Sequence, residues 1–381
     1  MDVLTILFWL SIFVLFYAYA GYPLLVRLIA FFRANAPKRS ASHLPSVTLL
    51  ISAYNEEAVI EDKIRNSLAL RYPRDLLEIV VVSDGSDDGT AQIARGFAGQ
   101  GVRLNHYEGR IGKTACLNKA VPDSNGDIIV FSDANALYDA DALKHLAENF
   151  ADPGVGLVTG YTRYASPDSA GASVGLYAAI EKFTKQAESE IGSCVGADGA
   201  LFALRRQLYR PLRQTDINDF VIPLNVVRQG FRAVLDERVF CVEQAAGDTR
   251  AEFRRQVRIT NRTLRALFAN RDLFDPVRHG LFAFQLFSHK AVKFVAPFFF
   301  ILFIVCTVLQ AGRGSGYFLL LLAMAGFGLL AAAGRRDRRR NVLDRLSSLC
   351  GTFAAANAAI IGGWFQFLKG ERYTTWTPIK R

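Results

Sequence analysis

Ile79-Val80-Val81-Val82-Ser83-Asp84-Gly85-Ser86 is an apolar run that ends at an acidic turn. Two other runs end in the same way: residues 47–52 lead into Ala53-Tyr54-Asn55-Glu56, and residues 128–132 lead into Asp133-Ala134-Asn135. Short β-branched runs bounded by turn residues predict strands buried on both faces. Because ligands of open α/β sheets bind beyond the carboxyl ends of the strands, we expect these acidic turns to share one rim. Such a rim suits hydroxyl groups and a hard cation rather than a bare anion.

Strand and helix patterns alternate on either side of these turns. The first half predicts strands at residues 47–52, 78–83, 102–106 and 127–132, with helices at 57–70, from 88 onward, at 112–121 and at 139–150. The less regular second half predicts strands at residues 155–164, 201–205 and 232–235, with helices at 173–191, 220–230 and 250–269. The alternation indicates an α/β domain with a mostly parallel sheet and right-handed crossovers.

Four runs without charge flank this domain in a chain of 381 residues, 51% of them hydrophobic: residues 3–26, 294–312, 314–334 and 346–368. Each is long enough to span a membrane. A cleavable signal peptide is the alternative for the first run, but no basic segment precedes it and it is too long. Arg27, Arg33 and Lys38 follow it, so the positive-inside rule places the amino terminus outside and the domain in the cytoplasm.

We therefore divide the chain into an N-terminal transmembrane helix (1–34), a cytoplasmic α/β domain (35–270) and an interfacial helix with a C-terminal transmembrane region (271–381). Much of the net charge of +10 lies in Arg335-Arg336-Asp337-Arg338-Arg339-Arg340. We interpret this run as a topology anchor beside anionic lipid rather than a nucleic-acid surface. Three crossings after the domain would put residues 369–381 outside, whereas an interfacial or re-entrant segment would keep them inside. The sequence leaves both open.

Asp84 and the Asp133 triplet are the first candidates for ligand binding. Asp84 lies several residues before the next predicted helix, so we interpret it as a ligand residue rather than a helix cap. Asp133 is followed two residues later by Asn135, a second oxygen ligand, and such a pair can hold Mg²⁺ or Mn²⁺ against a diphosphate. A helix cap is the alternative account of this triplet.

Asn218-Asp219 opens a helix late in the domain, where an acceptor would bind. A carboxylate there could act as a general base on an attacking hydroxyl. Further on, Arg254, Arg258, Arg262 and Arg265 share one face of a basic helix. They form either a solvated or lipid-facing stripe or a clamp on a departing diphosphate, for which Arg258 is the best candidate.

Residues 45–267 resemble the family 2 glycosyltransferases, whose nucleotide-diphospho-sugar transferase domain has the Rossmann-like GT-A fold. The motifs that carry the resemblance are residues 52–57, 82–90, 112–118, 133–135, 196–205 and 218–219. The membrane layout resembles the polysaccharide-synthase branch. The resemblance implies a GT-A domain with one N-terminal and about three C-terminal transmembrane helices.

The resemblance also implies how a donor would be held. Ala53, Tyr54, Glu56 and Asp84 would bind the uridine of a UDP-sugar, with Lys113 near the base. For the diphosphate, it implies that Asp133 coordinates Mg²⁺ or Mn²⁺.

The reaction residues implied by the resemblance come later in the chain. Asp198 and Gly199 would lie in the acceptor loop. Asp219 would be the base for a transfer that inverts the sugar carbon, and Arg258 would stabilise the leaving UDP.

The sequence departs from the family pattern in three places. Asn135 stands where an Asp is common, and Asn218 stands where an acidic residue is usual. The Gln-x-x-Arg-Trp motif, tied to processive synthesis, appears as Arg255-Gln256-Val257-Arg258-Ile259. Without the Trp, its stacking on a sugar would be lost. The sequence therefore leaves processivity open.

Together these features predict an inverting, metal-dependent glycosyltransferase in the plasma (inner) membrane. Its catalytic domain would face the cytoplasm and move a hexosyl or N-acetylhexosaminyl group from a UDP-sugar to a lipid-linked acceptor or a growing polysaccharide. Membrane lipid is an expected partner and nucleic acid is not. The alternative hypothesis is a catalytically silent nucleotide-sugar-binding subunit of a membrane polysaccharide assembly.

Overall fold

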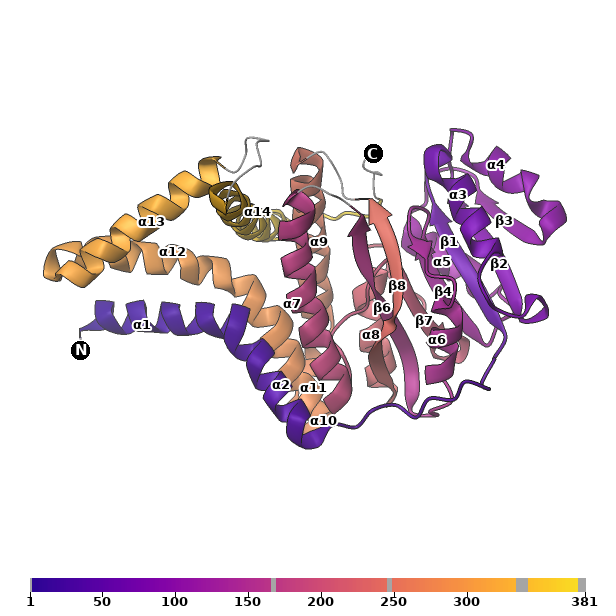
Figure 1. Ribbon diagram of the computed structural model, residues 1–381, viewed down its shortest axis with the longest axis horizontal. Coiled ribbons are helices and arrows are strands. Elements are labelled where there is room, and N and C mark those ends of the chain that lie inside the picture. The colour runs from indigo at the N-terminus through magenta and orange to yellow at the C-terminus, as the bar shows by residue number, and fades with distance from the viewer. Residues whose placement is uncertain (1, 166–168, 245–248, 334–341, 376–381) are drawn as a thin grey trace.

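The computed structural model describes residues 2–165, 169–244, 249–333 and 342–375 (Figure 1). Its centre is an eight-stranded sheet with the strand order β3-β2-β1-β4-β7-β6-β8-β5. The strands are β1 Val47–Ala53, β2 Leu77–Asp84, β3 Val102–Tyr107, β4 Ile128–Asp133, β5 Leu137–Tyr138, β6 Val155–Ala165, β7 Leu201–Arg205 and β8 Arg232–Gln244.

The first half of the sheet is parallel and confirms the predicted rim. β3, β2, β1 and β4 run in the same direction, with Ser52 opposite both Val82 and Asp133, and Asp84 opposite Tyr107. The acidic turns after β1, β2 and β4 therefore leave the sheet at one edge. All seven residues of β1 are buried, as the β-branched run predicts.

The second half is mixed, which the sequence did not predict. β7 runs antiparallel to both β4 and β6, while β6 and β8 are parallel with two register shifts. β8 extends nine residues beyond its predicted end at Leu235, through Asp236-Glu237-Arg238. These charged residues interrupt the apolar pattern, so the sequence did not predict the rest of β8. β5 was also not predicted, because a run of two residues is too short to detect.

Helices cover both faces of the sheet. The domain helices are α3 Glu57–Leu68, α4 Thr90–Gly96, α5 Lys113–Ala120, α6 Ala142–Asn149, α7 Ser169–Ile191, α8 Asn218–Arg228 and α9 Thr249–Ala269, with 3-10 turns at Arg74–Leu76, Ala98–Gln100, Arg206–Leu208 and Arg271–Phe274. One core packs α3, α4 and α6 against side chains such as Leu49 and Val81, and the other packs α5, α8 and α9 against Leu50 and Val80. This alternation along each strand is the period-2 pattern of a sheet buried on both faces.

Apolar helices lie on one side of the domain. One continuous but bent helix is formed by α1 Val3–Phe16, a π-helical turn at Tyr17–Gly21 and α2 Tyr22–Arg33 (Figure 1). The C-terminal part contains α10 Pro276–His279, α11 Leu281–Leu286, a π-helical turn at Phe287–Ala291, α12 Val292–Gln310, a 3-10 turn at Ala311–Arg313, α13 Ser315–Ala333 and α14 Val342–Leu368. Tyr17 and Ser288 join the two π turns through their hydroxyls, 2.7 Å apart.

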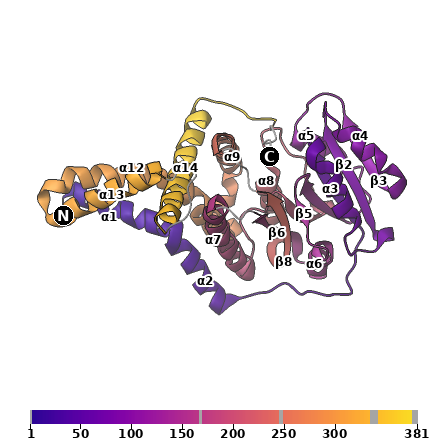
Figure 2. The ribbon, with the colours of Figure 1, turned by 45° about the horizontal axis from the view of Figure 1, so that its top comes forward.

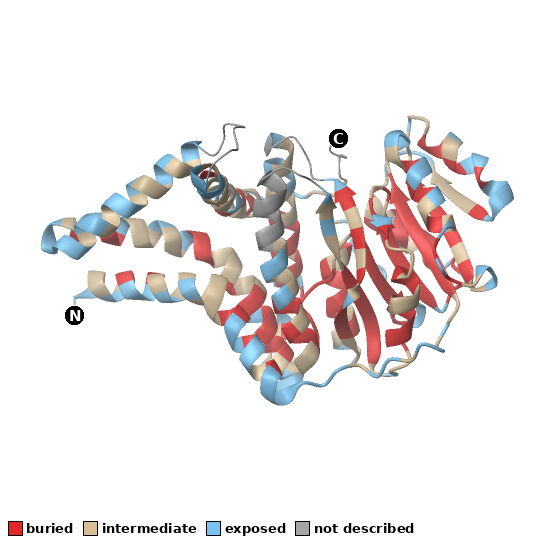
Figure 3. Ribbon diagram, viewed as in Figure 1, coloured by how far each residue is buried: buried red, intermediate tan, exposed pale blue. Residues whose placement is uncertain are grey.

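Among the described residues, four helical segments are candidate membrane spans by length and composition: Val3–Arg33, Leu281–Arg313, Ser315–Ala333 and Val342–Leu368. Figure 1 shows α1, α12 and α13 extending together away from the sheet. Figure 3 shows their surfaces mostly exposed or half-buried, in contrast to the buried strands. The predicted anchor at residues 335–340 lies outside the described residues.

Candidate active site

The turns after β1 and β2 are joined into one unit. The Asn55 amide donates to Asp87 Oδ1 at 2.5 Å, and its oxygen accepts from the Asp87 N–H at 3.1 Å. The Asn55 N–H also donates to Ser86 Oγ at 3.1 Å. Asn55 has φ +52°, a left-handed conformation that Asn adopts more readily than most residues. The two turns therefore form a rigid floor at the rim.

Three predicted uridine-binding residues lie on this floor. Ala53 is buried at the end of β1, and the Glu56 N–H donates to Thr90 Oγ1 at 2.8 Å. Tyr54 has the Arg110 guanidinium 3.8 Å from its ring centroid, a cation–π contact. The structure thus brings Ala53, Tyr54 and Glu56 to the rim together, and their contacts with a uridine stay a prediction.

Asp84 holds the turn before α5 through hydrogen bonds to its backbone, a role that the sequence did not predict. Its buried carboxylate accepts hydrogen bonds from the Ile111 N–H at 2.8 Å and from the Gly112 N–H at 3.0 Å, and Cys116 Sγ lies 3.4 Å away. It therefore fixes the segment that enters α5, where Gly112 has φ +93°. Burial is the main cause that raises the pKa of Cys116, with Asp84 adding to it, so the thiol stays protonated. Whether Asp84 also binds uridine remains a prediction.

Lys113 and Asp133 meet at the rim. Lys113 begins α5, and its Nζ lies 2.5 Å from Oδ1 of Asp133, the last residue of β4. The Asp133 side chain is 38% exposed and therefore open to a ligand. Two residues later, the Asn135 amide nitrogen is buried without a hydrogen-bond partner among the described residues. A buried donor without an acceptor is costly, so this side chain is suited to a bound group.

Lys63 supports the loop that carries this pair. The α3 side chain is fully buried, donates to the Ala136 carbonyl at 2.5 Å and lies 3.5 Å above the Tyr138 ring centroid. Burial lowers the pKa of Lys63 to about 7. Sequence reasoning missed Lys63, because a lysine within an amphipathic helix is usually on the solvated face.

Asp219, the predicted base, lies in the first turn of α8. Its Oδ1 is shielded from solvent and has no hydrogen-bond partner within the described part of the chain. Burial raises the pKa of Asp219, Lys113 and Lys185 lower it, and the carboxylates of Asp133 and Asp198 raise it further. The side chain therefore has a free acceptor atom and a basicity above that of an ordinary Asp.

The predicted acceptor loop is held against Asp219. Asp198 accepts hydrogen bonds from the Thr162 N–H at 2.8 Å, from the Thr162 hydroxyl at 3.0 Å and from the Ala200 N–H at 3.0 Å. The Ala197 N–H donates to the Asp219 carbonyl at 2.7 Å. The hydrogen bonds of Asp198 hold the backbone of the loop in place. Gly199 faces the proposed base, since a Cβ at Gly199 would lie 2.9 Å from Asp219 Oδ2.

Lys185 on α7 was missed by sequence reasoning. Its buried Nζ donates to the Ala197 carbonyl at 3.2 Å and lies 3.7 Å from Glu181 Oε1. Burial works against the charge, but Glu181, Asp198 and Asp219 raise the pKa of Lys185, so it stays a cation behind the base. No sequence pattern marks Lys185, because α7 and α8 are brought together only by the tertiary fold.

Two arginines of α9 donate hydrogen bonds to backbone carbonyls, and whether the arginines of this face act together as a clamp stays a prediction. Arg262 donates to the carbonyls of Thr215 and Asp216, just before α8. Arg265 donates to the Glu371 carbonyl at 2.6 Å.

Arg258 differs from these two. Among the residues that the structure describes, it has no hydrogen bond or ion pair, and burial beside Arg262, Arg255 and Arg110 lowers its pKa to about 10. A guanidinium crowded by other cations is suited to an incoming polyanion.

The segment after α14 returns to this site. A Cβ on Gly112 would lie 2.5 Å from the Thr374 carbonyl oxygen, so residues 371–375 run close to the turn that Asp84 fixes. Asn261 and Arg265 both donate to the Glu371 carbonyl. Residues 371–375 therefore lie beside the domain, and the side of the membrane on which the C-terminal segment lies stays a prediction.

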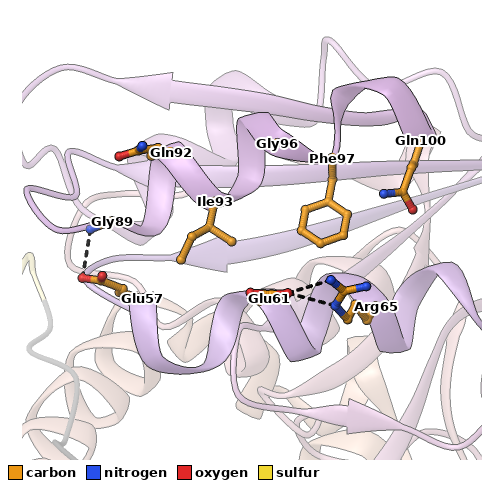
Figure 4. A pocket seen from close by; sticks show the side chains of 9 residues that line it. All are labelled: Glu57, Glu61, Arg65, Gly89, Gln92, Ile93, Gly96, Phe97 and Gln100. Carbon is orange, nitrogen blue, oxygen red and sulfur yellow. Dashed lines mark hydrogen bonds and ion pairs between the residues drawn. The ribbon is translucent and has the colours of Figure 1, made fainter.

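A surface hollow of about 560 Å³ lies elsewhere, between α3 and α4 (Figure 4). Its charged residues are already paired, Glu61 with Arg65 at 2.7 Å and Glu57 with the Gly89 N–H at 3.0 Å. None of the predicted site residues lines this hollow. We therefore place the candidate site at the rim, where Lys113, Asp133 and Asp219 converge.

Residues 48–213 match the family described as Glycosyl transferase family 2. This segment includes Asp84, Asp133 and Asp198 and ends before Asp219 and Arg258.

Two curated relatives share the name poly-beta-1,6-N-acetyl-D-glucosamine synthase. The protein of Staphylococcus aureus (strain COL) is 34% identical over 136 residues, which are 35% of this chain and 32% of that protein. The protein of Staphylococcus epidermidis is 26% identical over 222 residues, which are 57% of this chain and 53% of that protein. The chain thus spans between a third and about half of the length of these relatives.

Among solved structures, the mannosyltransferase PcManGT from Pyrobaculum calidifontis, in complex with GDP-Man and Mn²⁺, is similar over 96% of this chain and 100% of that chain. The TM-score is 0.74 and the sequence identity is 24%, a likeness of fold. Together with the family match, it confirms the fold that the sequence predicted: the chain contains a glycosyl transferase family 2 domain with the GT-A fold.

Proposed function

We propose that the chain is an inverting glycosyltransferase that moves a sugar from a UDP-sugar to a hydroxyl of a lipid-linked or growing glycan. The observation that carries this proposal is the Asp219 carboxylate, whose Oδ1 is shielded from solvent without a partner while Oδ2 faces Gly199. A carboxylate oxygen without a partner and with a raised pKa can take the proton of a hydroxyl that comes within hydrogen-bond reach.

The proposed transfer reaction follows from the positions of Asp219 and Arg258. Oδ1 of Asp219 takes the proton of the acceptor hydroxyl as the hydroxyl oxygen forms a bond to the anomeric carbon. The bond from that carbon to the diphosphate oxygen breaks on the opposite face, and its electron pair leaves with the nucleoside diphosphate. Arg258 donates hydrogen bonds to the departing diphosphate, because its guanidinium is not engaged by the described residues.

A divalent cation fits the residues at the end of β4. The described residues contain no group of three His, Cys, Asp or Glu that could hold a metal by themselves. Mg²⁺ and its analogues are, however, commonly held by one or two carboxylates together with substrate phosphates. Asp133 supplies a half-exposed carboxylate and Asn135 supplies an amide oxygen two residues later. A bound Mg²⁺ or Mn²⁺ would neutralise charge on the leaving diphosphate. Lys113 pairs with Oδ1 of Asp133, so a cation there would have to displace the Lys113 ammonium from this oxygen or bind through Oδ2.

The donor is proposed from the relatives. Their name contains N-acetyl-D-glucosamine, which supports UDP-N-acetylglucosamine as the first donor to test. The structural neighbour was solved with GDP-Man, which makes GDP-mannose the second.

We place the domain at the cytoplasmic face of the plasma membrane, with the boundaries 1–34, 35–270 and 271–381. The four apolar helical segments found in the described part of the chain support a membrane location. The basic residues Arg27 and Arg33, at the domain end of the first helix, support the cytoplasmic side.

The proposal is tested by nucleoside diphosphate release from the detergent-purified chain. UDP-sugars and GDP-mannose are supplied with Mg²⁺ or Mn²⁺ and an extract of membrane glycolipids as acceptor. Release with one donor, lost on chelation and in Asp133→Ala, is the expected result. Calorimetric binding of UDP without release from any donor would instead support the silent nucleotide-sugar-binding subunit.

A further inference from the structure

The direction of α14 differs from that of the other apolar helices. It is long and apolar enough to cross a membrane, but α1, α12 and α13 extend together from the domain, while α14 runs across them (Figures 1 and 2). In Figure 1 it is seen almost end-on, and in Figure 2 it stands between these helices and the domain. Length and composition alone therefore do not decide where α14 lies.

The second half of α14 is docked on the domain helix α9. A Cβ on Gly363 would lie 2.4 Å from Thr260 Cβ, and one on Gly362 would lie 3.1 Å from Val257 Cγ2. These two glycines let the helices approach closely. Beyond them, the Phe367 ring is stacked on Phe268 of α9 at a centroid distance of 5.1 Å.

α9 cannot enter the hydrocarbon layer alongside α14. It carries Arg254, Arg255, Arg258, Arg262 and Arg265, and every arginine at the centre of a bilayer is strongly disfavoured. Because α14 packs along α9, the two helices must lie at the same depth relative to the bilayer. That depth is the boundary between the domain and the membrane, where Trp364 donates from Nε1 to the carbonyl of Phe294, near the start of α12, at 2.9 Å.

The outer surface of α14 suits the boundary of a bilayer. Val342, Leu343 and Leu346 at its first end, and Phe365 and Leu368 at its last end, are between 46% and 75% exposed. Charged residues are also present, since Asp344 and Arg345 lie in the first two turns and the arginine-rich run 335–340 precedes the helix in the sequence. Apolar side chains beside basic ones are typical of helices that lie in the lipid interface.

From these observations we infer that α14 lies along the membrane surface on the side of the catalytic domain and does not cross the bilayer. α12 leads away from the domain and α13 leads back, so the chain reaches α14 already on the domain's side. The Glu371 and Thr374 contacts with Arg265 and Gly112 are then made without a further crossing. The partner of this helix is the headgroup layer and upper acyl region of the lipid leaflet that faces the domain.

Cysteine labelling tests this inference independently of any sugar transfer. Cys350 is replaced by Ser, because the other four native cysteines are buried. Single cysteines are then introduced at three exposed positions: Lys369 after α14, Ser315 at the start of α13, and Gln100 in the domain. A membrane-impermeant maleimide is applied to right-side-out and inside-out vesicles. Lys369→Cys should react from the same side as Gln100→Cys and from the side opposite to Ser315→Cys. Labelling of Lys369→Cys together with Ser315→Cys would show that α14 crosses.

A depth measurement provides the second readout. Bimane is attached to Leu346→Cys on α14 or to Val305→Cys on α12, both 46% exposed, in liposomes whose lipids carry bromine at defined depths. Shallow bromines should quench Leu346→Cys best, and deep bromines should quench Val305→Cys best. Preferential quenching of both positions by the deep bromines would overturn the inference.

Discussion

Gly199 and Asp219 are so close that a single methyl group would not fit between them. A Cβ built on Gly199 would lie 2.9 Å from Asp219 Oδ2, closer than real Cβ contacts come. Gly199 has no left-handed φ that would itself require glycine. The contact with Asp219 is therefore the reason for a glycine at this position, and it links the acceptor loop to the proposed base.

Replacing Gly199 by Ala should lower kcat about 10²-fold, because a displacement of the base of roughly 1 Å has an effect of that order. Steady-state kinetics with the donor identified above measure the change. Gly192→Ala is the matched control, since a Cβ there meets no atom of the described residues within 4 Å. Equal kcat in the two variants would show that the Gly199 contact does not position Asp219.

Asp219→Asn should lower kcat by about 10² to 10⁴, the usual contribution of a general base, with the Kd for UDP unchanged. It should leave the Tm at pH 7 equal or higher. Burial raises the folded-state pKa of this carboxyl, so its stabilising contribution is present at acidic pH and is lost as the pH rises through that pKa. The neutral amide avoids that loss. Full activity of Asp219→Asn would rule out Asp219 as the base, and a lower Tm would indicate a structural role.

Three strands of the parallel half, β1, β2 and β4, were predictable because they are short runs rich in β-branched residues that end at a turn residue. The sequence also predicted that Asp84 and Asp133 lie at the ends of strands and Asp219 at the start of a helix. Such positions can be predicted because the carboxylate directly follows or precedes an apolar run in the sequence.

Other features depend on contacts across the chain. The charge of Lys185 interacts with Asp198 and Asp219, both more than ten positions along the chain. Asp84 accepts hydrogen bonds from the distant Ile111 and Gly112 N–H groups. The course of α14 is likewise invisible in its composition, because the close contact of Gly363 with Thr260 sets it.

Lys185→Met should move the acidic limb of the kcat/KM profile to higher pH. The Lys185 ammonium lowers the pKa of Asp219, so without it the base holds its proton to a higher pH. Lys182→Met is the control: Lys182 is on the same helix, pairs with Glu237 at 3.2 Å and is not among the main charges acting on Asp219. A pH profile that moves in neither variant, or equally in both, would contradict this role of Lys185.

Arg258→Ala and Arg262→Ala should fail in different ways. Arg258 has no hydrogen bond or ion pair to the residues that the structure describes, so its loss should reduce kcat about 10²- to 10³-fold with little change in Tm. Arg262 is buried and donates to the Thr215 and Asp216 carbonyls, so its loss should lower the free energy of unfolding by about 1–3 kcal/mol.

Arg271→Ala is the control for charge alone, since this exposed arginine follows α9 outside the site. Kinetics and thermal unfolding of the three variants separate the two effects. If Arg258→Ala mainly lowered Tm and left kcat intact, the proposed contact with the leaving diphosphate would be wrong. If Arg271→Ala lowered kcat as much as Arg258→Ala, the effect would come from the overall positive charge of this region rather than from a contact made by Arg258.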